Sequence, residues 1–170
     1  MLTIRKAEIR DVPAIHELVR HYAAQRVMLA RPLQEIYEDV WEFTVAEENG
    51  QVLGCGAIKL YSAELAEIRS LCVLPGSPGR GVGTALLQSL LDEAEGLHLR
   101  TVFALTLVSG FFAKLGFREV GRETLPLKVW RDCLQCEKYF SCDENTLVLD
   151  LASRSLSSAV SRREVAQVSA

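Results

Sequence analysis

The stretch LCVLPGSPGRGVGTALL, residues 71–87, decides how the rest of the chain is interpreted. It reads as the end of an apolar strand, a turn after Pro75 and the start of an amphipathic helix. Gly79, Gly81 and Gly83 alternate where the helix begins, and they leave the backbone N–H groups of its first turn bare. An anion can approach such a helix N-terminus closely, so the pattern predicts a phosphate-binding turn.

Two common phosphate-binding loops do not fit this turn. A P-loop has lysine followed by serine or threonine after its last glycine, whereas the letters after Gly81 are VGT. A dinucleotide-binding fingerprint has glycines at its first, third and sixth positions, and neither Gly79 nor Gly81 starts such a series. The favoured ligand is therefore a pyrophosphate held by amide donors, by the helix dipole and by Arg80. Spacing alone leaves a plain glycine-rich turn as the alternative.

The composition is that of one ordinary globular domain. The chain has 170 residues, of which 49% are hydrophobic and 24% are charged, and its formal net charge is −3. This charge gives no reason to expect nucleic acid or an acidic membrane as a partner, and no apolar run approaches the ~18 residues of a membrane span. The first residues show no apolar signal-peptide core after their charges, so a cytoplasmic location is expected.

Hydrophobic periodicity predicts strands and helices that alternate along the chain. The expected strands are 2–7, 66–73, 101–107, 117–121 and 145–151, with a hairpin over 43–60. The expected helices follow Asp11, which can cap the first of them, and then cover about 34–41, 86–94 and 110–116. The hairpin turns at Asn49-Gly50, a dipeptide favoured in tight turns. The order predicts an α/β fold with one mixed sheet and helices on both of its faces.

Two segments in this order resemble the signatures of the GCN5-related N-acetyltransferase (GNAT) superfamily. Residues 71–87 look like its acetyl-CoA loop, and FFAKLGFREVG (111–121) looks like its second signature. The resemblance covers about 2–151 and implies one acetyltransferase domain (1–151). The remaining residues, 152–170, are rich in serine and small residues without an apolar face, so a peripheral tail is expected there. The resemblance also implies a mostly antiparallel sheet of six to seven strands. Pro78 stands where the family has arginine or glutamine, and proline offers neither charge nor N–H, which implies weaker cofactor binding.

The resemblance implies a place for acetyl-CoA between two splayed parallel strands, here residues 66–73 and 102–107. Backbone groups of the first strand would hold the pantetheine like an added strand, and one of its N–H groups would polarise the thioester carbonyl. The cofactor contacts implied in this way are Leu71, Cys72, Val73, Gly79, Arg80, Gly81, Val82, Gly83, Thr84 and Phe112.

Residues 31–73 resemble N-acetylglutamate synthases, particularly their short forms, and 124–144 resemble an insertion common in those forms. The resemblance implies Glu67 as the general base that takes a proton from the amine, and Ser109 as the acid for the leaving thiolate. Spacing alone favours a surface or ion-paired carboxylate at Glu67, and the resemblance favours the base. Many relatives carry a tyrosine acid in the short helix, but this chain has Phe111-Phe112 there.

A glutamate substrate carries two carboxylates, so cations are expected in its pocket. The resemblance implies Arg31 as a substrate-binding residue. Arg69 lies two residues from Glu67 on the same strand face, so it can bind a carboxylate or pair with Glu67. Ser70 beside it is the third residue expected to bind substrate. Longer relatives carry Arg-x-Ser just before the last strand, whereas this chain has CDE at 142–144. Lys128 or Arg131 can take over this role, or each can be a solvated surface charge. Glutamine or another amino acid therefore stays open as the substrate.

The five cysteines form an odd set, which argues against a disulfide framework. Cys55 and Cys72 lie in apolar strands and are expected in the core. Cys133, Cys136 and Cys142 have the spacing C-x₂-C-x₅-C, whose first pair is a common zinc half-site, although a structural zinc site needs four ligands. Bound zinc, reduced core cysteines and a redox-sensitive pair are the three interpretations that remain.

The favoured hypothesis is an acetyl-CoA-dependent enzyme that transfers an acetyl group to the α-amino group of an amino acid, L-glutamate, and so makes N-acetylglutamate, the entry to arginine biosynthesis. By resemblance a homodimer is expected. The alternatives are acetylation of another small amine or of a protein N-terminus, and a CoA-binding regulator without turnover.

Overall fold

The structure is a computed structural model that describes residues 1–76, 80–126, 131 and 133–154. The predictions made for Pro78, Gly79, Lys128 and most of the tail lie outside the described residues.

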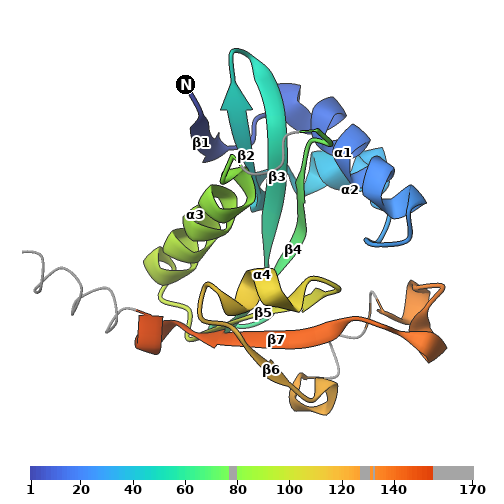
Figure 1. The fold of residues 1–170 in the computed structure, drawn as a ribbon, viewed down its shortest axis with the longest axis vertical. Helices are drawn as coiled ribbons and strands as arrows, with labels where there is room; N and C mark the ends of the chain where they lie inside the picture. Colours follow the sequence, from blue (N-terminus) through green and yellow to red (C-terminus); the bar gives the residue numbers. More distant parts are fainter. Residues whose placement is uncertain (77–79, 127–130, 132, 155–170) are drawn as a thin grey trace, which may run out of the picture.

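Seven strands form one sheet in the order β1-β2-β3-β4-β5-β7-β6 (Figure 1). Their bounds are β1 (Thr3–Lys6), β2 (Phe43–Glu48), β3 (Gln51–Leu60), β4 (Leu65–Val73), β5 (Thr101–Thr106), β6 (Arg118–Val120) and β7 (Asn145–Asp150). All neighbouring strands are antiparallel except β4 and β5, which run parallel. The predicted mixed, mostly antiparallel sheet is confirmed.

Helices cover both faces of this sheet, as the order of elements predicts (Figure 1). Their bounds are α1 (Val12–Ala24), α2 (Leu33–Glu38), α3 (Val82–Gly96) and α4 (Ser109–Ala113). The buried side chains of α1 and α2 pack with Cys55 and Ala57 of β3, whereas Phe112 of α4 and most buried side chains of α3 pack in the cluster that contains Ile58. Neighbouring residues of a strand face opposite ways, so the two clusters lie on opposite faces.

Local residue chemistry explains the hairpin between β2 and β3. Asn49 and Gly50 both adopt positive φ, 53° and 80°, which is the conformation that a two-residue hairpin turn of the primed type requires. The predicted turn is therefore confirmed. A register shift between Ala46 and Glu47 follows the turn, and beyond it Cys55 lies opposite Val45 in the apolar interior.

Two local expectations need correction. The expected capping role of Asp11 is wrong, because its carboxylate instead accepts hydrogen bonds from Arg5 and from the backbone N–H of Glu8, at 2.7 and 2.8 Å. The expected helix over about 34–41 ends at Glu38, and a short 3₁₀ turn follows at Val40–Glu42. Within the described residues, no helix has both the length and the apolar character needed to span a bilayer.

Candidate functional site

The sheet opens between its two parallel strands. β4 and β5 pair only at Leu65–Thr101, Ala66–Val102 and Glu67–Phe103. Beyond these residues β4 follows β3 as far as Val73, while β5 follows β7 along its whole length. The two strands therefore diverge after Glu67, and the predicted splay of the parallel strands is present.

A bulge in β4 lies at the point of divergence. Ser70 has a φ of 53°, and the register with β3 passes from Ala57–Arg69 to Cys55–Cys72, so two residues of β4 face Gly56 alone. Such a bulge bends its strand and increases the local twist, which carries the end of β4 away from β5. A Cβ at Gly56 would stand 2.9 Å from the side chains of both Leu71 and Leu90, so glycine permits this close approach.

The end of β4 presents a backbone edge to the opening. Leu74 donates its N–H to Leu53 on β3 at 2.7 Å, so strand alternation turns the backbone groups of Val73 the other way. The Tyr22 hydroxyl from α1 donates to the Val73 carbonyl at 2.6 Å. The thiol of Cys72 points into the core, where it lies 3.6 Å from the buried Cys55 thiol. The Cys72 thiol is therefore engaged in the core.

The N-terminus of α3 lies at the same end of the opening. Gly81 precedes it with a φ of 72°, and the N–H of Ala85 makes a helical bond to the Gly81 carbonyl at 2.9 Å. The N–H groups of Val82, Gly83 and Thr84 therefore have no acceptor within the helix, and they can bind a cap or a ligand. The Val82 side chain is buried in the core, and a Cβ at Gly83 would contact Val73 and Phe111.

Arg80, which is expected to bind pyrophosphate, is engaged elsewhere in this structure. Its guanidinium donates to the Glu48 carboxylate at 2.6 Å, and the N-terminal amine of Met1 lies 3.7 Å from the same carboxylate. The hydrogen bond from Arg80 is the main reason that the pKa of Glu48 lies below its ordinary value. Half of the Arg80 side chain is exposed, so solvent screens this pair and an anionic ligand can compete for the guanidinium.

A cavity of about 1410 Å³ extends from the opening between β4 and β5 to the loop after α1 and to the segment 131–144. It brings together many residues that the sequence singled out: Arg31, Glu67, Arg69, Ser70, Leu71, Cys72, Val73, Gly83, Phe112, Arg131, Cys133, Cys136 and Cys142. Ser109, Arg80, Gly81, Val82 and Thr84 are described residues outside this lining. Ser109 begins α4 directly after Val108, which does line the cavity.

Glu67 is half-buried at the point where the two strands part. It lies opposite Lys59 on β3 and beside Phe103 on β5, so these three side chains share one face of the sheet. The Tyr61 hydroxyl donates to Glu67 Oε2 at 3.0 Å. The geometry therefore places a carboxylate in the cavity, at the base of the opening.

The arginines expected to bind substrate are paired with acidic residues. Arg31, which is 11% exposed, donates to Glu35 at 2.7 Å. Arg69 lies 3.2 Å from Glu42 and 3.6 Å from Asp39. These two acids are shared with a further cation of the same face, Lys59. The cluster is close to neutral, so a bound carboxylate must share these cations with their present partners.

The three clustered cysteines are half-buried free thiols that line the cavity. Among the described residues, no group of three or more histidine, cysteine or acidic side chains is arranged to hold a metal ion, so the zinc interpretation has no support there. Burial is the main cause that raises the pKa of Cys133 to about 11, and the negative charge of Glu67 is a smaller one. Cys133 is therefore a thiol at neutral pH and a weak nucleophile.

Sequence reasoning missed several residues of this cavity. Lys59 lies on β3 and Tyr61 directly follows that strand, two residues further along, and the strand period of two was the signal that they share a face with Glu67. Glu144 also lines the cavity, and burial is the main reason that its pKa is raised. No local pattern marked Asp39, which pairs with Arg69 from the segment after α2.

Comparison with known proteins places this arrangement in a family. The acetyltransferase (GNAT) domain family matches residues 39–119. An uncharacterized N-acetyltransferase of Chlorobaculum tepidum is 42% identical over 151 residues, which cover 87% of this chain and 96% of that protein. An amino-acid acetyltransferase of Mycobacterium tuberculosis is 40% identical over 139 residues, covering 80% of this chain and 78% of that protein.

The fold agrees with these matches. N-acetylglutamate synthase from Neisseria gonorrhoeae, solved in complex with coenzyme A and N-acetyl-glutamate, superposes with a TM-score of 0.81 at 29% identity. The superposition covers 89% of this chain and 35% of that one. The resemblance inferred from the two sequence signatures is confirmed. This chain belongs to the acetyltransferase (GNAT) family.

Proposed function

We propose that this protein is an acetyl-CoA-dependent N-acetyltransferase that acts on the α-amino group of an amino acid, with L-glutamate as the favoured acceptor. The observation that carries the proposal is the divergence of β4 and β5 directly beside the Glu67 carboxylate. A cofactor can enter between the strands, and an amine can reach both the cofactor and a base at their point of contact.

The residues of the opening fit coenzyme A. The edge of β4 over Leu71, Cys72 and Val73, where the backbone groups of Val73 face away from β3, can pair with the amide groups of pantetheine. The N–H groups of the first turn of α3 can donate hydrogen bonds to the diphosphate, which would lie at the positive end of the helix dipole. Arg80 can add a charged hydrogen bond once it leaves Glu48. When bound, acetyl-CoA supplies an acetyl thioester that is open to attack by a neutral amine.

Glu67 is the proposed general base. An α-amino group with an ordinary pKa of about 8 is mostly protonated at neutral pH, and only its neutral form is a nucleophile. The Glu67 carboxylate, directly or through a water, can accept the proton as the amine attacks. Ser109 stays the proposed proton donor to the leaving thiolate, from its place at the start of α4 beside the cavity.

The acceptor is proposed from the charges of the cavity and from the relatives. Arg31 and Arg69 can share their guanidinium groups with a substrate carboxylate, and Ser70 can add a hydroxyl. The acids paired with these arginines suit an acceptor that also carries an ammonium group. The Mycobacterium relative is named an amino-acid acetyltransferase, and the Neisseria structure holds N-acetyl-glutamate. A homodimer and a cytoplasmic location stay predictions.

Release of the CoA thiol, measured with each of the twenty amino acids, tests the proposed function. We expect the highest kcat/KM with glutamate, and N-acetylated product by mass spectrometry. Best turnover with lysine, or thiol release that needs no amino acid, would reject glutamate as the acceptor.

A Glu67→Gln variant tests the role of the base. We expect kcat to fall about 10²-fold, because the variant cannot accept the proton. The matched control is Glu64→Gln, since Glu64 is exposed in the turn before β4, and we expect it to keep the wild-type rate. Full activity of Glu67→Gln between pH 6 and 9 would remove Glu67 from the mechanism.

A further inference from the structure

Tyr61 is held so that its hydroxyl reaches the Glu67 carboxylate. It directly follows β3, and its backbone N–H donates to the Leu65 carbonyl at 2.9 Å, which closes the turn into β4. Its ring packs against the fully buried ring of Phe103, with the ring centroids 5.7 Å apart. The backbone and the ring are therefore both fixed, and the hydroxyl donates to Glu67 Oε2 at 3.0 Å.

The strand register explains why this bond forms. Lys59 is directly opposite Glu67, and Tyr61 lies two residues further along the same face. A diagonal neighbour on adjacent strands is within reach of a long aromatic side chain. The contact is therefore built into the pairing of β3 with β4, and it does not depend on a flexible surface side chain.

We propose that Tyr61 is a positioning residue for Glu67, which orients its carboxylate and favours its ionised form; this proposal rests on the proposed function of Glu67. The terminal torsion of a glutamate side chain is broad, so a carboxylate without such a bond samples many orientations. A hydrogen bond to one oxygen restricts that rotation. A donor also stabilises the charged form of a carboxylate relative to the neutral form.

Other charged and titratable groups surround Glu67, and a substitution of Tyr61 leaves them unchanged. Lys59 on β3 and Arg69 on β4 share its face, and both are paired with acidic side chains. From the segment after β6, Arg122, Cys133 and Glu144 line the same cavity. The pH profiles of the wild type and of Tyr61→Phe therefore share all of these groups, and a difference between the two profiles is due to the Tyr61 hydroxyl.

Tyr61→Phe tests the proposal, because it removes the hydroxyl and keeps the ring that packs on Phe103. We expect kcat at neutral pH to fall about 10-fold, the equivalent of one hydrogen bond, with the KM for acetyl-CoA unchanged. The acid limb of the kcat profile should move to higher pH, since the ionised carboxylate has lost a donor. Tyr37→Phe is the matched control, because Tyr37 lies on α2 with a third of its side chain exposed.

A double variant separates positioning from direct contact with the substrate. Tyr61→Phe added to Glu67→Gln should lower kcat no further than Glu67→Gln does alone, because Tyr61 acts through Glu67. A further 10-fold loss would mean that the hydroxyl acts independently of Glu67 and would overturn the proposal. A Tyr61→Phe enzyme with the wild-type rate and pH profile would overturn it as well.

A measurement without turnover distinguishes failure of this inference from failure of the proposed function. The side-chain carboxyl signal of Glu67 can be followed by ¹³C NMR against pH in the wild type and in Tyr61→Phe, with Glu67→Gln used for assignment. We expect the titration midpoint to be higher in Tyr61→Phe, whether or not any amino acid is acetylated. Equal midpoints would refute the effect of Tyr61, even if Glu67→Gln were inactive.

Discussion

Gly81 shows how one residue shapes the start of α3. Its φ of 72° lies in the left-handed region, and nothing stands within 4 Å of the place where a Cβ would be. Glycine is therefore required by the backbone conformation and not by lack of space. Gly83 has a different role, because it is helical and a Cβ there would contact Val73 and Phe111 at 3.6 and 3.7 Å. The alternation of glycines predicted the turn, but it did not separate these two roles.

Gly81→Ala is expected to lower the free energy of unfolding by about 1 kcal/mol, because an L-residue with a side chain is disfavoured at this φ. Equilibrium urea denaturation measures the change. Gly96→Ala is the control, since Gly96 ends α3 and its Cβ would also meet open space. There alanine should raise the stability, by up to about 1 kcal/mol, because of its higher helix propensity. Equal effects of the two substitutions would contradict a conformational requirement at Gly81.

At the scale of elements, the seam between β3 and β4 controls the opening. Two glycines of β3 lie where β4 comes closest. A Cβ at Gly54 would stand 2.8 Å from the Cys72 carbonyl oxygen and 3.0 Å from a methyl group of Leu86. A backbone oxygen cannot move aside without moving its strand. The close contact therefore holds the part of β4 that is proposed to receive pantetheine.

Gly54→Ala should displace β4 from β3 and destabilise the fold by about 1–3 kcal/mol, as overpacking does. We also expect the KM for acetyl-CoA to rise, because the displaced residues include Cys72. Thermal unfolding and initial-rate kinetics measure the two effects. Gly110→Ala in α4 is the comparison, since its Cβ would meet no neighbour within 4 Å, and it should lose no stability. If Gly54→Ala were as stable as the wild type, β3 and β4 could accommodate a methyl group at this position and the proposed close contact would be wrong.

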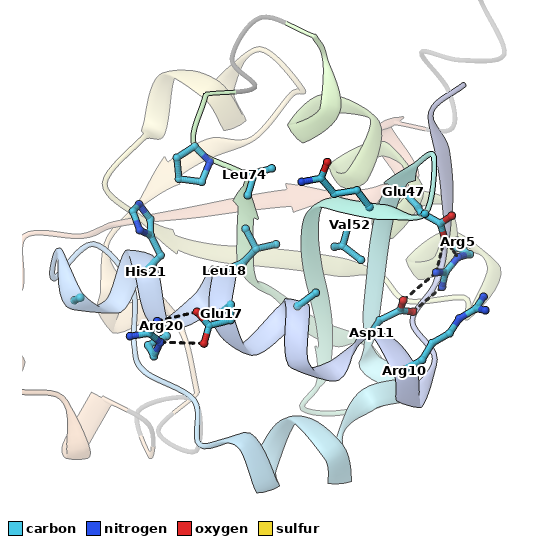
Figure 2. A pocket seen from close by; sticks show the side chains of 15 residues that line it. Arg5, Arg10, Asp11, Glu17, Leu18, Arg20, His21, Glu47, Val52 and Leu74 are labelled. Carbon is cyan, nitrogen blue, oxygen red and sulfur yellow. Dashed lines mark hydrogen bonds and ion pairs between the residues drawn. The ribbon is translucent and has the colours of Figure 1, made fainter.

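For the whole molecule, an ion-pair network ties the first strand to the body of the fold. Figure 2 shows it at one end of a hollow of about 900 Å³ between α1 and the β2–β3 hairpin. Arg5 of β1 donates to Asp11 at 2.7 Å and to Glu47 of β2 at 2.6 Å. Asp11 is 5% exposed, and the hydrogen bond from Arg5 is the main reason that its pKa is lowered. These bonds thus link the edge strand β1 to the start of α1.

Asp11→Asn is expected to lower the free energy of unfolding by about 2 kcal/mol at pH 7, because a part-buried guanidinium–carboxylate bond is lost. A lowered pKa means that the stabilisation is present above the unfolded value of about 3.9 and is lost as the pH falls through the folded value. The difference in free energy of unfolding between wild type and variant should therefore become smaller below pH ~4. Urea denaturation at a series of pH values measures it.

Glu17→Gln is the control for this network. Glu17 pairs with Arg20 in the same hollow, but 64% of each side chain is exposed, so we expect no measurable change in stability (Figure 2). If the difference in free energy of unfolding between wild type and Asp11→Asn stayed constant down to pH 2, the ionised Arg5–Asp11 pair would not be the cause of that difference.

The candidate site could be predicted only in part. Glu67 was found from its strand and from the resemblance, and the structure places it at the base of the opening. The partners of Arg69 and Arg80 were not found, because they lie far away along the chain. Arg69 meets Glu42 across 27 residues, and Arg80 meets Glu48 across 32. The expected pyrophosphate contact of Arg80 thus competes with an acid that no local pattern indicated.

The sequence by itself determined the order of strands and helices, the hairpin turn and the glycine turn before α3, because these depend on side-chain periodicity and on backbone freedom within a few residues. Only the tertiary structure decided how far β4 and β5 pair, that Tyr61 reaches Glu67, and that Asp11 serves Arg5 instead of capping α1. These features depend on strand register and on long-range packing, where each group takes the best partner that the whole fold brings within reach.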